Sequence, residues 1–467
     1  MIKRKEEQFT KFDILSLVIG SIIGWGSFTL PGSKFLPEAG LLRTVLAFVI
    51  GGIAVIFIQA GYHHMMTDQR EDGGEFAYTF RYLGPTHGFI CGWGLVLCYL
   101  SIVPLNATAF VQIFRVLFGE KMNWVYLYSI GGTEIYLADV LIASAILLIF
   151  TWINLRGVSM SSFVQNLLTV ALIGVSVVLF IIMLNITDLS KFRETYIAAG
   201  KVSFYKVAPV LAIVPFLFVG FDVIPQVVTD LGFDQKKASL FAVLGIVCGV
   251  LMYSLLSTMT ALAYSPAEAA EKEWALGEAI LFYLGRPGFI ALVIALFAAV
   301  SAGINGFLLA SARLFAALAD YKMLPEAFGK SNRYRVKSNA LYFVAAVSLI
   351  APWFGRPVIG YIVDMSSVLA ALAYFYVCFI SFRRVRQAKA KIPVGIGMLM
   401  SIIFILLLII PGSPAFLGKE ARIFLGVWIL LGLVYYLIYR KNVLKKAEGA
   451  VTAGEIKGGR GDASDKK

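Results

Sequence analysis

Long apolar stretches recur along the whole chain, and short polar connections separate them. About twelve of these stretches are long enough to cross a hydrocarbon core as helices. They cover residues 12–36, 44–66, 86–117, 135–153, 163–186, 204–231, 238–264, 289–318, 339–354, 359–382, 392–410 and 423–439, of which the ninth is short. The connections leave no room for a soluble domain. The pattern therefore predicts an all-α polytopic membrane protein with about twelve transmembrane helices.

Two of the stretches contain residues that break helices. Three glycines and a proline lie between Gly20 and Pro31 in the first stretch, and Gly220 and Pro225 interrupt the sixth. Such residues weaken the helical hydrogen-bond ladder at a depth where water cannot replace it. Interrupted segments at corresponding places in two halves of a chain indicate the binding site of a transporter.

The two breaks also predict how the chain is organised. Pairing stretches one to five with six to ten puts a broken stretch first in each half. Because five is odd, the second half would run in the opposite sense, which gives an inverted repeat. We therefore expect a ten-helix transport core over residues 1–382, with repeats at about 12–186 and 204–382. Two additional transmembrane helices would occupy residues 383–446, and the polar tail, residues 447–467, is expected to be disordered and cytoplasmic.

The net charge of +13 follows the predicted topology. With both termini in the cytoplasm, most of the 41 Lys and Arg residues fall on the inner side, including the cluster from Arg383 to Lys391. An acid-rich loop from Glu268 to Glu278 then falls outside. This asymmetry obeys the positive-inside rule. The composition therefore predicts a multi-pass protein of the cytoplasmic membrane, embedded in lipid and without a nucleic-acid partner.

Several classes of chemistry are excluded by what the chain carries. Its four cysteines lie within or beside apolar stretches, so we expect no disulfide-linked subunit. His63, His64 and His87 do not form a convergent ligand set, so neither a metal nor a cofactor is expected. The sequence has no Gly-x-x-x-x-Gly-Lys-Ser/Thr nucleotide loop and no hydrolase spacing. The chain is therefore predicted to be neither an enzyme nor an ATP-driven pump.

The two breaks offer complementary backbone chemistry. If the first helix stops near Ile23 and restarts near Gly26, the new half exposes N–H groups that suit a carboxylate. At the second break, free carbonyls around Phe218 and Val219 suit an ammonium group. A site that binds both groups a few ångströms apart describes the backbone of an amino acid. The alternative is a glycine-rich packing face, in which Gly20 and Gly24 form a contact between helices.

Asp222 is the only acid near the middle of the sixth stretch. An intramembrane carboxylate costs about 2.5–3.5 kcal/mol on insertion scales, so it calls for a function or a partner. Proton coupling or contact with a cationic substrate group is one reading, and satisfaction of neighbouring N–H groups in the break is the other. Asp364, near the start of the tenth stretch, is better explained as a helix cap.

Other polar residues within the apolar stretches have two readings as well. They could line a binding site, but hydrogen bonds between helices explain most of them better. This set comprises Asn106, Thr108, Gln112, Asn305, Tyr374 and Tyr376. Near the inner end of the eighth stretch, Arg313 and Asp320 are predicted to form a structural or gating ion pair.

The motif Gly20-Ser-Ile-Ile-Gly-Trp-Gly-Ser-Phe28, followed by Pro31, resembles the first-segment motif of the amino acid–polyamine–organocation (APC) permease superfamily, usually G-x-I-I-G-[ST]-G-I-F. Four other stretches agree with that superfamily, in order along nearly the whole chain. They are residues 73–78 (GGEFAY), 165–169 (QNLLT), 220–222 (GFD) and 305–313 (NGFLLASAR), the last running on to Pro325. The likeness is strong for the family and weak for the substrate.

The resemblance implies a leucine-transporter-like fold, in which two inverted repeats of five helices alternate access to a central site and two further helices follow. It also implies that the substrate carboxylate meets the backbone of the first break and the amine meets the carbonyls of the second. The residues carried over for substrate binding are Ile22, Ile23, Gly24, Trp25, Gly26, Phe218, Val219, Gly220 and Asp222. Asp222 is in addition the candidate for coupling.

The chain departs from the superfamily pattern at informative positions. Trp25 stands where a small hydroxyl residue usually bonds the substrate carboxylate, so that contact does not carry over, and the indole either shrinks the pocket or closes over the substrate. Leu172 stands where many members place a lysine thought to substitute for sodium. The pairs Thr229-Asp230 and His63-His64 replace Glu-Glu and Ala-Glu. The chain therefore resembles a divergent subgroup.

These observations together predict a secondary amino acid permease, either proton-coupled or an exchanger. Within the superfamily, a polyamine or a cationic amino acid is the alternative substrate, because Asp222 lacks a buried cation. From another class, the chain could be a sensor that binds an amino acid without transporting it. A major facilitator carrier is disfavoured, since the Asp-Arg-x-Gly-Arg-Arg loop is missing. The sequence does not specify the oligomeric state.

Overall fold

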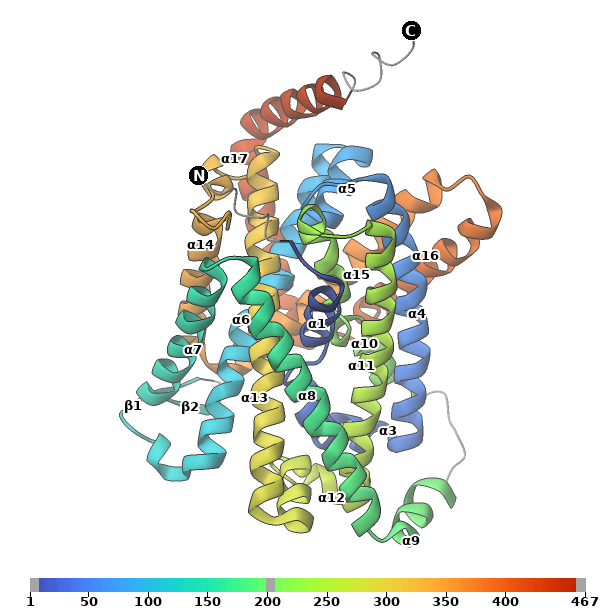
Figure 1. Cartoon of the computed structure of the whole chain (residues 1–467), viewed down its shortest axis with the longest axis vertical. Coiled ribbons are helices and arrows are strands. Elements are labelled where there is room, and N and C mark those ends of the chain that lie inside the picture. Colours follow the sequence, from blue (N-terminus) through green and yellow to red (C-terminus); the bar gives the residue numbers. More distant parts are fainter. Residues whose placement is uncertain (1–7, 131, 199–205, 459–467) are drawn as a thin grey trace.

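The computed structural model of the chain describes residues 8–130, 132–198 and 206–458. Its long helices run mostly along one axis and form a single bundle (Figure 1). The predicted start of the sixth stretch, residue 204, lies outside the described residues.

Up to residue 198 the elements are α1 (Lys11–Ile22), α2 (Gly26–Leu30), η1 (Pro31–Phe35), α3 (Leu36–Ala39), α4 (Leu41–Asp68), α5 (Gly74–Leu83), α6 (Pro85–Phe118), η2 (Gly119–Met122), β1 (Tyr126–Ile130), β2 (Thr133–Tyr136), α7 (Leu137–Leu155), α8 (Val158–Ile186), α9 (Leu189–Phe192) and η3 (Arg193–Ala198). They are followed by α10 (Ala208–Leu217), η5 (Phe221–Asp230), α11 (Gln235–Ala263), α12 (Pro266–Ala270), α13 (Ala275–Asp320), η6 (Glu326–Gly329), α14 (Ser338–Ile350), η7 (Ala351–Phe354), α15 (Gly355–Arg384), α16 (Ala388–Ile409) and α17 (Lys419–Gly458).

The membrane-length helices confirm the predicted fold class. Within the described residues, ten helices are long and apolar enough to cross a membrane. The pair Lys11–Ile22 and Gly26–Ala39, bent by 44°, makes an eleventh candidate, and the shorter apolar helix Ser338–Phe354 corresponds to the short ninth stretch. The chain is thus an all-α polytopic membrane protein whose spans match the predicted stretches. The division into inverted repeats remains a prediction.

Local sequence explains where several of these helices begin. Thr10 and Asp13 form a capping box at the start of α1, in which each side chain accepts from the backbone N–H of the other residue. Pro85 opens α6 directly after Gly84, whose positive φ of 89° suits glycine. The start of each of these two helices is therefore specified by residues at the start itself.

A β-hairpin between α6 and α7 was not predicted. Strands β1 and β2 pair antiparallel, and β2 takes up the first two residues of the predicted stretch 135–153, so that α7 begins only at Leu137. The hydropathy of residues 135–153 is continuous across this boundary, which is why an apolar stretch alone could not locate it. The Asp139 carboxylate accepts from the backbone N–H of Tyr136 at 3.0 Å and so caps the start of α7.

The structure differs from expectation near the C-terminus as well. Helix α17 continues to Gly458, into the stretch for which the sequence predicts disorder. Residues 447–458 contain three alanines, two glutamates and a lysine, which favour helix, together with three glycines, which disfavour it. Residues 459–467 lie outside the described part.

The bundle has two distinct ends, which are named here by what they carry. The terminal face carries the first and last described residues, 8 and 458, and α5, whereas the hairpin face carries β1, β2, α9 and α12 (Figure 1). Helix α1 lies near the middle of the bundle and packs against α8, α11 and α13 (Figure 1).

Burial separates the central spans from the peripheral ones. The most apolar window of the broken span Ala208–Asp230 is 83% buried, whereas that of Lys419–Ile438 is only 11% buried. Apolar side chains such as Leu251 and Phe163 are exposed on outer helices, where lipid would cover them. The second broken span therefore lies at the centre of the bundle, and the last helix lies at its edge.

Candidate functional site

The first break interrupts the helix at the predicted place. Helix α1 ends at Ile22, Ile23 adopts an extended conformation, and α2 begins at Gly26. The N–H of Ile23 still donates to the carbonyl of Ile19 at 2.9 Å. Within the described residues, the N–H groups of Gly24 and Gly26 donate to no acceptor. Two backbone donors at the start of a half-helix are thus available to a ligand.

The second break lies against the first one. Helix α10 ends at Leu217, and Gly220 has a φ of 134°, which side chains other than glycine rarely adopt. A Cβ at Gly220 would lie 2.7 Å from the Cβ of Ser21 and 2.9 Å from the backbone nitrogen of Ile22. Glycine is therefore needed here both for the conformation and for the contact between the two breaks.

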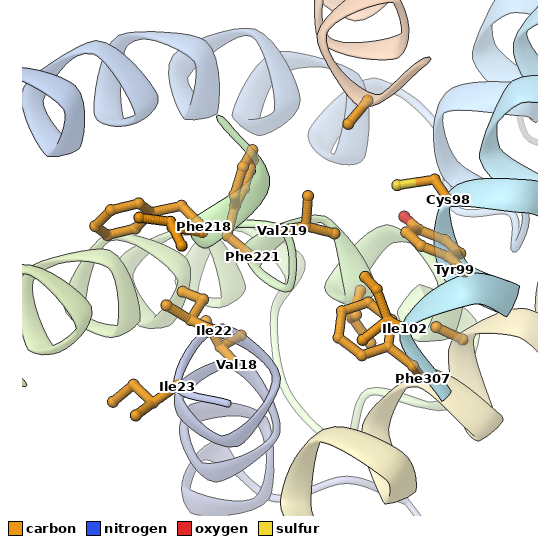
Figure 2. Packing of buried hydrophobic residues seen from close by; sticks show 14 of the residues in the cluster. Val18, Ile22, Ile23, Cys98, Tyr99, Ile102, Phe218, Val219, Phe221 and Phe307 are labelled. Carbon is orange, nitrogen blue, oxygen red and sulfur yellow. The ribbon is translucent and has the colours of Figure 1, made fainter. Parts of the chain in front are cut away.

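The carbonyl end of the second break carries the complementary groups. Within the described part of the chain, the carbonyls of Phe218 and Val219 accept no hydrogen bond. Figure 2 shows Ile22 at the end of α1 beside Phe218 and Phe221, with Val219 between them and Tyr99. Donors from one break and acceptors from the other therefore lie in one region.

Tyr253 on α11 joins the two breaks, and the sequence did not identify it. Its hydroxyl lies 3.3 Å from the carbonyl of Ile22 and 3.4 Å from the carbonyl of Leu217. The side chain is buried, and its ring packs against Phe218 with the centroids 6.0 Å apart. A tyrosine in a long apolar helix looks like any packing residue in the sequence, because only the fold brings these carbonyls to it.

A cavity of about 820 Å³ borders both breaks. Part of its wall consists of Ser21, Ile22, Gly24, Trp25 and Gly26 from the first break, with Leu217 and Val219 from the second. Ile102, Asn106, Phe307 and Tyr253 complete this deep part. The cavity also reaches Glu134 in the exposed β2 strand, so it extends toward the hairpin face.

The structure brings some of the predicted binding residues to the cavity wall and places others behind it. Ile22, Gly24, Trp25, Gly26 and Val219 line the cavity. The lining does not include Ile23, Phe218, Gly220 or Asp222, and the side chains of Ile23, Phe218 and Asp222 are fully buried. The substrate-binding role of all nine residues remains a prediction.

The other polar residues also separate into two groups. Asn106, Thr108 and Gln112 line the cavity from α6. Asn305 instead accepts from the Asn154 side chain at 2.8 Å and donates to Gln165 at 2.8 Å, which is a hydrogen-bond network between helices.

Tyr374 and Tyr376 on α15 lie outside the cavity lining. Tyr374 is fully buried and stacks at a tilt on Phe221, with the ring centroids 5.3 Å apart. Tyr376 bonds the His87 ring at 3.1 Å. Asp364, by contrast, is exposed and lies in the cavity wall, although the sequence favoured a capping role for it.

Trp25 closes part of the cavity through a contact with α6. Its indole nitrogen donates to the Gln112 side-chain oxygen at 2.8 Å, and the residue is half-buried. The ring therefore spans from the first break to the opposite wall. The sequence identified Trp25 as unusual but could not supply its partner, which lies 87 residues away.

Asp222 is bonded within the break, as one of its two predicted readings requires. One carboxylate oxygen accepts from the N–H of Gly220 at 2.7 Å. The other accepts from the hydroxyl of Tyr99 at 3.0 Å. Both oxygens are thus engaged by the protein itself, on the side of the break that faces away from the cavity lining.

Arg313 forms ion pairs near the terminal face, but not with the predicted partner Asp320. It pairs with Asp72, in the connection before α5, at 3.2 Å and also with Asp230 at the end of η5. The predicted pair with Asp320 is wrong, because Asp72 and Asp230 approach Arg313 from other elements and the sequence gives no sign of them. Only 11% of the Arg313 side chain is exposed. The ion pairs tie α13 to η5 and to the loop before α5.

A bundle of central broken helices around a cavity with an apolar wall and a few polar groups is the architecture of a helical membrane carrier. The sequence narrows this class. The family described as "Amino acid permease" matches residues 9–434, and the chain belongs to that family, within the APC superfamily. It is therefore a membrane transporter and not an enzyme.

Three relatives are similar over nearly their full length. The branched-chain amino acid permease BcaP of Lactococcus lactis subsp. cremoris is 23% identical, covering 95% of this chain and 97% of the relative. The arginine/agmatine antiporter of Chlamydia trachomatis serovar L2 is 24% identical, with 94% of each chain covered. The serine/threonine exchanger SteT of Bacillus subtilis is 24% identical, with 93% and 96% covered.

Proposed function

We propose that this permease carries a small neutral amino acid across the cell membrane by alternating access through the cavity at the two breaks. The proposal rests on one observation above the others. The N–H groups of Gly24 and Gly26 and the carbonyls of Phe218 and Val219 have no partner within the described residues, and they lie on adjoining breaks. Such helix-end groups favour a carboxylate and an ammonium by about 0.3–2 kcal/mol each.

The lining of the cavity supports a substrate with a neutral side chain over one with a cationic side chain. A polyamine or a guanidinium group needs a facing carboxylate, and the deep part of the cavity has none among its described residues. Of the charged lining residues outside this deep part, Arg115 and Asp139 pair with each other at 2.7 Å, and the others are Lys34, Glu134 and Asp364. Asp222 is fully engaged behind the wall. Two of the three relatives are named for neutral amino acids and one for arginine and agmatine. The choice between a neutral and a cationic substrate therefore rests on the lining of the cavity.

The distribution of charge supports a cytoplasmic location for the terminal face and both chain ends. The basic cluster from Arg383 to Lys391 joins α15 to α16 on that side, and the acidic loop around Glu268 belongs to the hairpin face. With this orientation the cavity is open to the outside, while the Arg313 ion pairs close the inside. Transport would require those ion pairs to open as the outer side closes.

The proposed transport is either proton symport or exchange, with Asp222 as the coupling group. It is the carboxylate within the second break, and its neighbour Gly220 touches the first break. A change in its charge would therefore act on the contact between the two half-sites. This arrangement favours coupling through Asp222 over direct contact with the substrate.

The experiment that tests the function is a ligand screen followed by transport. We expect leucine, valine, serine or alanine to raise the melting temperature of the purified protein by mass action, and arginine, agmatine and putrescine to have no effect. Uptake of the tritiated ligand into proteoliposomes should then saturate with concentration. The accumulated ligand should also exchange with unlabelled ligand. Stabilisation by agmatine or putrescine alone would overturn the substrate class. Saturable binding without uptake or exchange would identify a sensor instead.

Replacing Trp25 by serine should broaden the substrate preference. Loss of the indole enlarges the cavity and frees Gln112. The apparent affinity for amino acids with larger side chains should therefore rise by about tenfold relative to that for alanine. Competition of all twenty amino acids against tritiated uptake measures this profile. Trp124→Ser is the matched control, because Trp124 is 57% exposed and lies outside the cavity lining. An unchanged profile in Trp25→Ser would contradict a role in specificity.

A further inference from the structure

A second buried carboxyl group lies on the terminal side of the second break. Glu75, near the start of α5, is completely buried. One of its oxygens accepts from the Tyr62 hydroxyl at 2.8 Å, and the other accepts from the Gln226 amide at 2.8 Å. These partners come from α4 and η5, so Glu75 joins three elements.

Tyr99 on α6 connects this carboxyl group to Asp222. Its hydroxyl lies 3.0 Å from a carboxylate oxygen of Asp222 and 3.5 Å from the Glu75 oxygen that Tyr62 also contacts. Figure 2 shows the hydroxyl of Tyr99 directed toward the second break. The single hydrogen of the hydroxyl can serve either carboxyl group but not both at once.

The cluster contains no positive charge to balance two carboxylates. Within the described residues, no Lys, Arg or His pairs with Glu75 or Asp222. The titratable groups that face the two carboxyls are Tyr62 on α4, Tyr78 on α5, Cys91 and Cys98 on α6, and Tyr374 on α15. All of these are neutral in their ordinary protonated form. Two adjacent carboxylates in a dry environment cannot both ionise cheaply, so the pair retains a proton.

We propose that Glu75 is the second proton carrier of this permease and exchanges one proton with Asp222 through the hydroxyl of Tyr99. This inference rests on the proposed transport function and deepens it. In the relay, protonated Glu75 gives its proton to the Tyr99 oxygen while the hydroxyl proton of Tyr99 passes to Asp222. Tyr99 is unchanged, Glu75 becomes a carboxylate and Asp222 becomes neutral. The reverse transfer restores the first state.

The position of α5 explains why Glu75, and not Asp222, would meet the terminal face. Asp72, which pairs with Arg313, precedes Glu75 by one turn of chain, across Gly73 and Gly74. A Cβ at Gly74 would lie 2.8 Å from the Gln226 side chain, so the start of α5 packs tightly against η5. Opening the Arg313–Asp72 ion pair would therefore loosen the packing of α5 against η5. Glu75 would then become accessible from the terminal face before Asp222 does.

The transport arm of the test uses Glu75→Gln in proteoliposomes with tritiated leucine and serine as probes. We expect uptake driven by a pH gradient to fall by about 100-fold, in the range of a lost proton-transfer group, while counterflow exchange continues. Glu271→Gln, at an exposed position on the hairpin face, is the matched control and should behave as the wild type. Wild-type accumulation in Glu75→Gln would overturn the proposal.

A second variant keeps the proposal testable if Glu75→Gln folds poorly. Tyr99→Phe removes the bridging hydroxyl and leaves both carboxyl groups in place. It should lose accumulation to a similar extent while Glu75 keeps its proton. Full accumulation by Tyr99→Phe would overturn the relay.

A spectroscopic arm separates this inference from the transport function itself. The infrared spectrum of the wild type at neutral pH should contain the C=O band of a protonated carboxyl group, which persists in Tyr99→Phe and disappears in Glu75→Gln. If that band is absent from the wild type, or unchanged in Glu75→Gln, Glu75 does not hold the proton, whatever the protein transports. If the band behaves as expected and no amino acid is transported, the proposed function fails and the proton site stands, but the relay to transport is overturned.

Discussion

Gly220→Ala is expected to abolish substrate binding and transport and to lower the stability of the protein. Alanine at a φ of 134° costs about 1–3 kcal/mol in backbone strain. The added Cβ would also fall 2.7 Å from Ser21 and 2.9 Å from the backbone of Ile22, and overpacking of this kind costs about 1–3 kcal/mol more. Because both contacts are with the first break, relief of the clash must separate the two half-sites.

Thermal denaturation and ligand-induced stabilisation measure this effect together. Gly174→Ala is the matched control, because Gly174 lies in α8 with open space around it and should tolerate alanine without change. The important result is the comparison of binding with folding. A folded Gly220→Ala protein that still binds amino acids normally would show that the breaks need not touch for the site to form.

The sequence predicted those features of the fold that depend on local properties of the chain. The apolar stretches correspond to helices because hydropathy and length are read directly from consecutive residues. The breaks at Gly24 and Gly220 were also predicted, since a helix-breaking residue acts on its own hydrogen-bond ladder. The sequence alone therefore locates both breaks to within a residue or two of the observed helix ends.

The sequence could not predict contacts that bring distant residues together. In the sequence, Tyr253 looks like a packing aromatic residue, and Glu75 looks like an acid in a loop. Only the fold brings Tyr253 to the carbonyl of Ile22 and buries Glu75 beside Tyr62. The predicted Arg313–Asp320 pair was wrong for the same reason. It was inferred from closeness along one helix, whereas the observed partners, Asp72 and Asp230, come from distant parts of the sequence. The β-hairpin was missed because hydropathy does not distinguish its second strand from the helix that follows.

The two readings of Asp222 make opposite predictions for one substitution. Asp222→Asn preserves the shape of the side chain, and its amide oxygen can still accept from the N–H of Gly220. The amide nitrogen can donate to the hydroxyl oxygen of Tyr99, so the break remains hydrogen-bonded. A purely structural role is therefore largely retained in this variant. The ability to bind and release a proton is lost completely.

We expect Asp222→Asn to lose amino acid accumulation driven by a pH gradient by about 100-fold or more, while counterflow of tritiated leucine or serine continues in proteoliposomes. Asp222→Ala is the informative comparison, because it strands the Gly220 N–H without an acceptor and should cost about 1–3 kcal/mol of stability. If Asp222→Asn accumulates substrate as the wild type does and only Asp222→Ala is impaired, Asp222 serves the break alone. Coupling would then have to reside elsewhere, and the cavity would be that of an exchanger.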